Sequence, residues 1–288
     1  MVWVNVVIQG ILLGGLYALY ATGLSVAFGV MRLVNLAHGD LSVVAAFMAF
    51  VVADHLGWNA LLTLLIVIPA MAFGGFVLQL VLLNFTLDSA LAPILATFGL
   101  SIIIQNALLE EFSADARGLE AGTIETESIE ITNEVSIGWF PLITLLTAIA
   151  LLAGLQLLVR YTALGRALRA TSDDRRAVQL MGIDSRKIFA TAMAISLATV
   201  AVAGIFLGIR TIFTPSSGPT RLIFAFEAVI IGGLGSLWGT LVGGIVLGVA
   251  QTVGAQISPG WGVLSGHLVF LAVLLLRPTG LFARSAPA

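Results

Sequence analysis

Residues 61–83 read LLTLLIVIPAMAFGGFVLQLVLL, an apolar run in which only one threonine and one glutamine carry polar side chains. The run is apolar on every side, whereas the strands of a transmembrane β-barrel alternate in polarity over segments of about ten residues. About 20 apolar helical residues cross a hydrocarbon layer about 30 Å thick, and lipid offers backbone polar groups no partner outside their own helix. The stretch therefore predicts a transmembrane α-helix.

The rest of the chain repeats this pattern. Of its 288 residues, 59% are hydrophobic and 10% are charged, and the mean hydropathy is +1.09. Apolar spans are predicted at residues 4–30, 40–57, 60–83, 91–109, 139–159 and 188–209, with two or three more in 222–276. We therefore expect an all-α polytopic membrane protein, a single domain over residues 1–288 with about eight or nine transmembrane helices, some of them broken or re-entrant.

Two polar loops carry opposite charge. Eight acidic residues and one arginine lie between residues 110 and 134, whereas seven basic and three acidic residues lie between 160 and 187. Short loops rich in Lys and Arg stay cytoplasmic, and acidic residues have little influence. We therefore predict a cytoplasmic loop at 160–187 and, one span away, an extracytoplasmic acidic loop at 110–138. Arg277 and Arg284 favour a cytoplasmic C-terminus, which requires three crossings within residues 222–276, or another number if part of that region is re-entrant.

Small residues recur every four positions in two of the predicted spans. They are Gly10, Gly14, Ala18 and Thr22 in the first span, and Gly232, Ser236, Thr240, Gly244 and Gly248 near the end. Such a stripe lets another helix approach closely where lipid supplies no hydrophobic driving force. These helices are expected to pack tightly against neighbouring helices.

The densest glycine cluster predicts a break or re-entrant turn at membrane depth. It reads GGLGS and comprises Gly232, Gly233, Gly235 and Ser236. Each glycine lowers helix propensity by about 1 kcal/mol relative to alanine, and irregular backbone is tolerated there only beside protein or a water-filled cavity. Glu227, five residues earlier, either faces a translocation pathway or a partner, or it lies at the outer interface next to Arg221.

A second break is predicted between the first two spans. Asn35, His38, Gly39 and Asp40 interrupt two apolar segments, and Asp40 is expected to cap a helix that begins at Leu41. The three histidines of the chain are not spaced as metal ligands are, so no metal site is predicted at this break.

The basic loop contains a segment with helix start and stop signals. Thr171 or Ser172 is expected to cap a helix of about ten residues with acids in its first turn. Gly182 supplies a left-handed C-terminal cap with Ile183 folding back, and Asp184 caps the next span. The residues assigned to this helix and its ends are Asp173, Asp174, Arg175, Ala177, Val178, Gln179, Leu180, Met181, Gly182 and Ile183.

Four apolar residues of this helix lie in a loop that should otherwise be solvated. They are Ala177, Val178, Leu180 and Met181. Apolar side chains exposed on a rigid element mark a surface for a protein partner. An interfacial helix lying on lipid headgroups is the alternative, and composition does not separate the two.

Three blocks of sequence resemble permease subunits of ABC importers of the branched-chain amino acid family. They are TALGRALRATSDDRRAVQLMGID at 162–184, GLYALYATGLSVAFGVMRLVNLAHGDL at 15–41 and AFEAVIIGGLGSLWGTLVGGIVLG at 225–248. The blocks stand in the family's order, and the second resembles the LivH subunit more than its LivM partner. The acidic loop matches no motif of the family.

The resemblance implies a prokaryotic cytoplasmic-membrane transporter with several partners. These are a second, LivM-like permease subunit, two cytoplasmic ATPases that bind ATP and Mg, and an extracytoplasmic solute-binding protein. No cofactor is expected on this chain, because its only lysine, Lys187, lies outside any P-loop. Residues 177–182 would dock in an ATPase groove, and the two helix breaks with Glu227 would line or gate the pathway.

Three alternatives stay open for the function. The first is a permease of the same family for urea, short amides or other amino acids in place of leucine, isoleucine and valine. The second is a stand-alone secondary transporter, which broken helices and a membrane carboxylate also permit. The third is an intramembrane hydrolase using Ser265 and His267, although residues two apart on a helix do not face each other.

Overall fold

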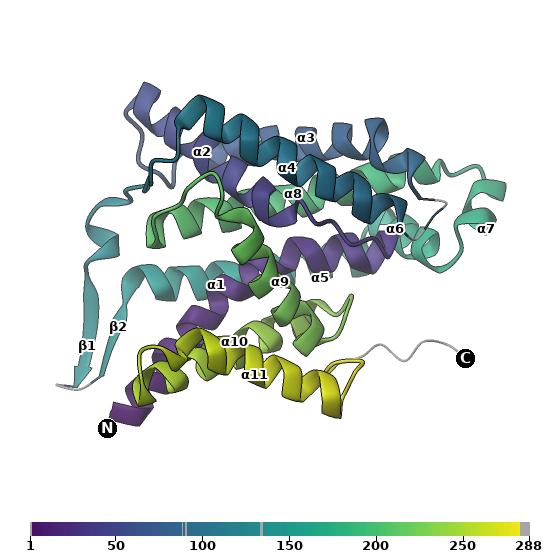
Figure 1. The fold of residues 1–288 in the computed structure, drawn as a ribbon. Coiled ribbons are helices and arrows are strands. Elements are labelled where there is room, and N and C mark those ends of the chain that lie inside the picture. Colours follow the sequence, from purple (N-terminus) through teal and green to yellow (C-terminus); the bar gives the residue numbers. More distant parts are fainter. Residues whose placement is uncertain (1, 88, 90, 133–134, 283–288) are drawn as a thin grey trace.

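Long apolar helices make up almost all of this protein (Figure 1). The computed structural model describes residues 2–282 except 88, 90, 133 and 134. The described residues form α1 Val2–Met31, α2 His38–Leu56, α3 Leu64–Val81, α4 Ala92–Phe112, α5 Trp139–Tyr161, α6 Ala163–Asp173, α7 Arg175–Leu180, α8 Ser185–Arg210, α9 Gly218–Gly232, α10 Leu237–Ile257 and α11 Trp261–Leu276. Short 3₁₀ turns occur at Leu83–Phe85 and Gly122–Glu125, and the strands are β1 Ser128–Thr132 and β2 Val135–Gly138.

Seven helices in the described residues are long and apolar enough to cross a membrane: α1, α2, α3 with its 3₁₀ extension, α4, α5, α8 and α10. The C-terminal region that was expected to hold two or three spans contains α10 and the shorter helices α9 and α11, of 15 and 16 residues. The all-α polytopic class is confirmed, and two of the C-terminal helices are shorter than full spans.

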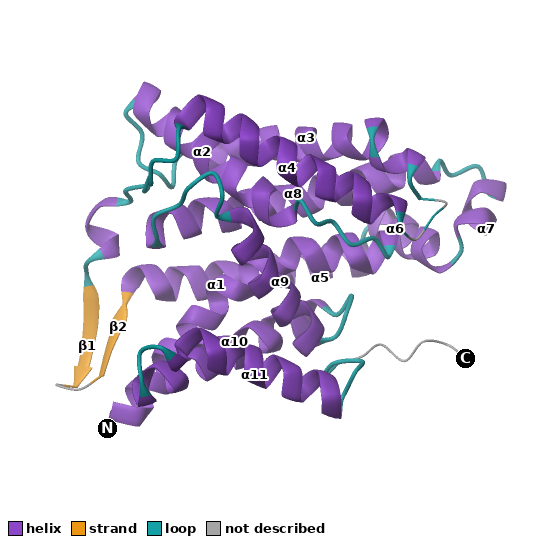
Figure 2. Cartoon of the chain, viewed as in Figure 1, coloured by secondary structure: helices purple, strands orange, loops and turns teal. Residues whose placement is uncertain are grey.

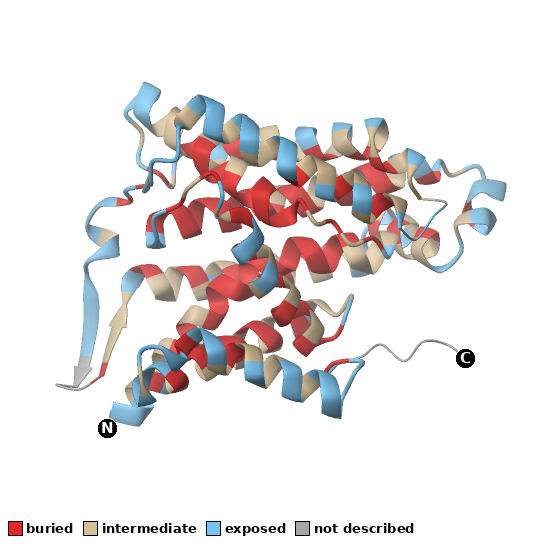
Figure 3. Cartoon of the chain, viewed as in Figure 1, coloured by how far each residue is buried: buried red, intermediate tan, exposed pale blue. Residues whose placement is uncertain are grey.

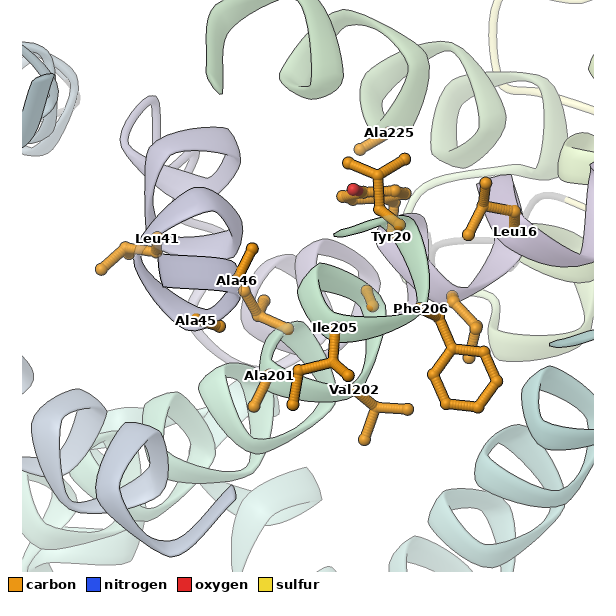
Figure 4. Close-up of a cluster of buried hydrophobic side chains, with 14 of the residues drawn as sticks. Leu16, Tyr20, Leu41, Ala45, Ala46, Ala201, Val202, Ile205, Phe206 and Ala225 are labelled. Atoms are coloured by element: carbon orange, nitrogen blue, oxygen red, sulfur yellow. The ribbon is translucent and has the colours of Figure 1, made fainter. Parts of the chain in front are cut away.

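Helices α1 and α8 form the centre of the bundle (Figure 3). Every residue of α1 from 14 to 27 is buried, and α8 is buried along most of its length. Helix α8 also packs against α2 and α3, and α1 against α5, α9 and α10. Figure 4 shows side chains of α1, α2, α8 and α9 meeting in this core, among them Tyr20, Ala46, Phe206 and Ala225.

The two stripes of small residues pack against each other. A Cβ atom added at Gly14 would lie 2.8 Å from the carbonyl oxygen of Gly244, and one added at Gly244 would lie 2.7 Å from that of Gly14. At Gly248 an added Cβ would approach the backbone of Gly10 and Gly14 as closely. The expected close helix approach is confirmed, and the partner of the first stripe is the second.

The acidic loop and the basic loop lie at opposite ends of the bundle (Figures 1 and 2). The acidic loop contains an antiparallel β1–β2 hairpin that the sequence analysis did not predict. Gln9 of α1 donates a hydrogen bond to the carbonyl of Ser136 at 2.8 Å and fastens the hairpin to the bundle. The alternation of isoleucine with polar residues in β1 was the available signal for a strand.

The described C-terminal residues return to the end of the bundle that carries the basic loop. The amide of Leu281 donates to the carbonyl of Ile231 at the end of α9, at 2.9 Å. The following turn, at Gly235, lines a cavity together with Asp173 of α6. The described chain therefore reaches the side of the basic loop after α9, α10 and α11, of which only α10 is long enough to span a membrane.

Candidate functional site

The basic loop folds as two short helices that are fastened to the bundle. The Thr162 hydroxyl accepts a hydrogen bond from the amide of Gly165 at 2.9 Å and caps α6. Leu168 and Thr171 of α6 are buried. The Ser172 hydroxyl donates to the carbonyl of Gly29 at 2.9 Å, which joins α6 to the end of α1. This hydrogen bond is a direct contact between α6 and α1.

Helix α7 begins later than the sequence predicted. Thr171 and Ser172 were expected to cap it, but both lie inside α6, and the Thr171 hydroxyl donates to the carbonyl of Ala167 at 2.8 Å. Asp173 ends α6. Asp174 is the cap, with its carboxylate accepting from the amides of the second and third α7 residues at 2.8 and 3.0 Å. The expected ten-residue helix is six residues long, because Asp174 leaves helical geometry to cap α7.

The end of α7 has the predicted geometry. The Gly182 amide donates to the carbonyl of Gln179 at 3.0 Å, and the Ile183 amide donates to that of Val178 at 3.2 Å. This is the Schellman pattern, and it requires the left-handed φ of +82° that Gly182 adopts. Asp184 then caps α8, accepting from the amide of Arg186 at 3.0 Å. Both predicted caps are confirmed.

Helix α7 presents an apolar surface to solvent (Figure 3). Leu180 is 91% exposed and Met181 is 67% exposed, and Ala177 is exposed as well. Val178 differs from the sequence expectation, because it is 1% exposed and lies on the buried side of α7. Three of the four apolar residues thus form the exposed face of a capped helix.

Polar contacts hold α7 against the start of α8. The Ser185 hydroxyl accepts hydrogen bonds from Gln179 at 2.7 Å and from Arg175 at 3.3 Å. The guanidinium of Arg175 also lies over the aromatic face of Phe189, 5.7 Å from the ring centroid. These contacts join α7 directly to the start of α8.

A cavity of about 440 Å³ lies beneath this loop, between α1, α5, α6 and the α9–α10 turn. It is lined by residues that the sequence assigned to two different features, the basic loop and the glycine break. Asp173 comes from the first, and Gly235 and Ser236 come from the second. The fold therefore joins the glycine break to the loop that carries α7.

The glycine break is a turn between two helices. Helix α9 ends at Gly232, and Gly233 has a φ of +104° that a residue with a Cβ rarely adopts. The Ser236 hydroxyl accepts from the amide of Gly239 at 3.1 Å and caps α10. The predicted break is confirmed, but its expected place at membrane depth is wrong, because the turn lies at the end of the bundle beside α6.

The first break places the start of α2 beside the middle of α1. Asn35 accepts from the amide of Ala37 at 3.0 Å, and His38 Nε2 lies 3.0 Å from the carbonyl oxygen of Tyr20. Gly39 contacts the backbone of Gly218 at the start of α9. The segment between α1 and α2 thus returns into the bundle, where α2 and α9 begin next to each other.

Asp40 does not cap a helix that begins at Leu41. Helix α2 begins three residues earlier, at His38, so Asp40 already lies in its first turn. Its carboxylate instead accepts a hydrogen bond from the Ser101 hydroxyl of α4 at 2.6 Å, and Gln105 donates to that hydroxyl at 3.0 Å. Asp40 and His38 are each 1% exposed. In the described chain, polar side chains of this break therefore form contacts between neighbouring helices.

Glu227 is buried in the bundle rather than placed at an outer interface. Its carboxylate contacts His267 Nδ1 of α11, and its side chain is 4% exposed against 37% for the histidine. Arg221 does not pair with it and donates to the hydroxyl of Tyr20 at 3.2 Å instead. His267 was not predicted from the sequence as the partner of Glu227, although both residues interrupt apolar runs.

Ser265 and His267 are not brought together as a nucleophile and base. The Ser265 hydroxyl donates to the carbonyls of Ala250 and Gly262 at 2.7 and 2.8 Å, which ties α11 to α10. With His267 directed to Glu227, the described geometry gives no support to a hydrolase.

Comparison with known proteins places this architecture in a family. The family model described as "Branched-chain amino acid transport system / permease component" matches residues 6–276. The high-affinity branched-chain amino acid transport system permease protein BraD of Pseudomonas aeruginosa is 29% identical over 296 residues, which are 96% of this chain and 94% of BraD. The permease protein LivH of Salmonella typhimurium is 30% identical over 295 residues, with the same coverage of both chains.

A second type of permease matches over a shorter stretch. LivM of Escherichia coli is 29% identical over 126 residues, which cover 43% of this chain and 29% of LivM. No solved structure matches this chain. Because the family match includes both helix breaks and the α6–α7 loop, this chain belongs to the family of branched-chain amino acid transport system permease components.

Proposed function

We propose that the chain is the LivH-like permease subunit of an ATP-driven ABC importer for leucine, isoleucine and valine in the cytoplasmic membrane of a prokaryote. The names of its relatives and the coverage of both chains support this substrate class. A second, LivM-like permease subunit completes the pore, and an extracytoplasmic binding protein delivers the solute. Urea, short amides and other amino acids are the alternative substrates.

Energy for transport comes from two partner ATPases that bind ATP and Mg. A P-loop needs Gly-x-x-x-x-Gly-Lys followed by Ser or Thr, and the only lysine of this chain lies in DSRKIF at the start of α8. No cofactor is assigned to this chain. Its part is to convert an ATP-driven movement of the partner into a movement of its own helices.

The observation that carries the proposal is the exposed apolar face of α7. Leu180 and Met181 are exposed on a helix that is capped at both ends. A rigid apolar element at the end of a membrane bundle fits a groove in a soluble subunit. Movement of α7 would reach α8 through Ser185 and α1 through the Ser172–Gly29 hydrogen bond.

Copurification with the ATPase subunits tests this role. Replacing Leu180 and Met181 together with aspartate is expected to abolish ATPase binding and uptake, while the protein still inserts and unfolds at an unchanged temperature. Ile257→Asp is the matched control, because Ile257 is 68% exposed at the far end of α10. Normal copurification of the ATPase with the double variant would refute the proposal.

The side of the membrane on which α7 lies is tested by labelling. The chain has no cysteine, so Gln179→Cys provides a single reactive thiol. In spheroplasts this thiol is expected to resist a membrane-impermeant maleimide until the cells are permeabilised. Thr126→Cys in the acidic loop is the control and should react at once. Immediate labelling at residue 179 would contradict the orientation.

The proposed pathway runs past the two helix breaks and Glu227. Glu227→Gln keeps the size of the side chain but weakens its contact with His267 on α11. We expect this variant to insert normally and to lose most uptake, measured with radiolabelled leucine. Unimpaired uptake would remove Glu227 from the pathway.

A further inference from the structure

A second cavity, of about 330 Å³, lies between α1, α8 and α9. Its volume is within the range of pockets that hold small ligands. Two arginines line it, Arg210 and Arg221, together with aromatic, leucine, serine and threonine side chains, and the lining includes no Asp or Glu. Neither arginine was predicted from the sequence to have a role in transport.

Arg221 is buried with unused hydrogen-bonding capacity. It is 9% exposed, and its Nη atoms donate to the Tyr20 hydroxyl at 3.2 Å and the Ile212 carbonyl at 3.4 Å. Its Nε atom has no partner among the described residues. A guanidinium has five N–H donors and cannot lose its charge in a protein. Two hydrogen bonds within the described chain therefore leave part of the hydrogen-bonding capacity of this fixed cation unused.

The position of Arg221 is unfavourable for a cation without an anionic partner. It lies in the first turn of α9, where the helix dipole disfavours positive charge. No carboxylate of the described chain forms an ion pair with it, and a buried unpaired charge costs several kcal/mol. Charged residues inside a membrane bundle usually mark the path of a substrate or ion.

Arg210 adds a second positive charge to the same cavity. It lies in the last turn of α8, where a cation is favoured, and it is exposed. No ion pair of Arg210 occurs within the part of the chain that the structure describes. The cavity thus combines two uncompensated cations.

Aliphatic and aromatic side chains form another part of the cavity wall. Leu13 and Leu16 of α1 and Leu207 of α8 contribute aliphatic surface. Phe224 contributes a ring whose centroid lies 5.2 Å from that of Tyr17, with the rings tilted by 34°. A ligand for this cavity needs both a negative group and an apolar body.

We propose that this cavity binds small apolar carboxylates, with Arg221 and Arg210 holding the carboxylate and the leucine and aromatic side chains contacting the apolar group. This inference rests on the proposed transport function and names the chemical feature of the solute that this subunit recognises. Paired N–H donors of a guanidinium match the two oxygens of a carboxylate. Urea and neutral amides lack that group and would leave both cations unpaired.

Charge-selective labelling tests the electrostatic half of the proposal in the purified full chain. Thr220→Cys places a thiol in the cavity, and Gly260→Cys is the control because a Cβ at Gly260 meets no atom within 4 Å. Anionic and cationic methanethiosulfonates of similar size are compared. For each thiol, the labelling rate with the anionic reagent is divided by the rate with the cationic reagent. This ratio is expected to be about tenfold higher at residue 220 than at residue 260.

Two variants that replace an arginine with a neutral residue test whether the arginines cause the preference for the anionic reagent. Arg221→Gln and Arg210→Gln, each made in the Thr220→Cys background, are expected to lower the ratio several-fold. Two variants are used because one of them could fail to fold, and either folded variant decides the question. A ratio that equals the control, or one that neither substitution changes, would overturn the proposal.

Protection from labelling tests carboxylate recognition itself. The ligands 4-methylpentanoate and 3-methylbutylamine share the apolar skeleton of leucine but keep only its carboxylate or only its amine. We expect millimolar 4-methylpentanoate and L-leucine to slow labelling at residue 220, and 3-methylbutylamine and L-leucinamide to leave it unchanged. Equal protection by acid and amine, or protection by neither, would contradict the inference.

These measurements need neither ATP nor a partner subunit. Failure of the proposed importer function would be seen as loss of ATPase copurification by the unmodified chain, with the labelling ratio intact. Failure of the carboxylate site would be seen as absent protection in a chain that still binds its ATPase.

Discussion

The α1–α10 interface and the surface of α7 both contain residues that are unusual for their surroundings. At the α1–α10 interface, glycines form a stripe in an apolar membrane helix. On α7, a leucine and a methionine lie in a charged loop. The glycines meet a matching stripe within the same chain. Leu180 and Met181 meet no covering side chain among the described residues.

The two regions therefore use small and apolar side chains for different purposes. At α1–α10 the absence of a Cβ allows backbones to touch, and such close packing favours helix association in lipid. On α7 the apolar side chains are held away from the bundle by Val178 and by two caps, so their burial has to come from another molecule. A substitution should consequently affect stability in the first region and association in the second.

The largest expected effect is that of Gly14→Val. The new side chain would meet the backbone of α10 at Ile245, which cannot move aside as a side-chain tip can. We expect the free energy of unfolding to fall by about 3 kcal/mol, measured as thermal unfolding in detergent by size-exclusion chromatography.

Gly74→Val in α3 is the matched control for that substitution. No atom lies within 4 Å of a Cβ built at Gly74, so its effect should stay within about 0.5 kcal/mol. Equal losses in the two variants would mean that close helix contact is not what the α1 glycines provide.

A smaller effect separates the two faces of α7. Leu180→Ala is expected to weaken ATPase binding by about 2 kcal/mol, or about thirtyfold in Kd, without changing the unfolding temperature. Val178→Ala removes two buried methyl groups and should lower unfolding free energy by about 1–2 kcal/mol. Surface plasmon resonance with the ATPase measures the first quantity. If Val178→Ala weakened ATPase binding and Leu180→Ala lowered the unfolding free energy instead, the partner surface would not be the exposed face of α7.

The smallest effect concerns the C-terminal cap of α7. Gly182→Ala places a Cβ in the left-handed conformation at a cost of about 1 kcal/mol, and Gly182→Asn should cost less because asparagine tolerates that conformation. Hydrogen exchange of the α7 amides is expected to rise more in the alanine variant. Identical exchange in both variants and the unmodified chain would show that the cap does not stabilise α7.

Local signals explain which parts of the candidate site could be predicted. Gly182 and Asp184 act on backbone groups only a few residues away, so sequence spacing is sufficient to assign their caps. Asp174 and Thr171 compete for the same role, and the outcome depends on where α6 ends. The start of α7 was therefore misplaced while its end was correct.

Long-range contacts explain the remaining errors. Asp40 has good local chemistry for a cap, yet its carboxylate is used by Ser101, which lies 61 positions away in the sequence. Glu227 and His267 are 40 positions apart and meet only because α9 and α11 are neighbours. A single sequence does not report which helices become neighbours.

Hydrophobicity, charge and short-range capping signals determine the spans, the loops and the turn that closes α7, since each depends on transfer to lipid or on hydrogen bonds within a few residues. The pairing of the two glycine stripes, the hairpin at Ser128–Thr132 and the arginine-lined cavity are decided by the tertiary structure alone. In a membrane bundle nearly every face is apolar, so hydrophobic pattern cannot choose among neighbours. Close packing and the need to satisfy buried polar groups make that choice.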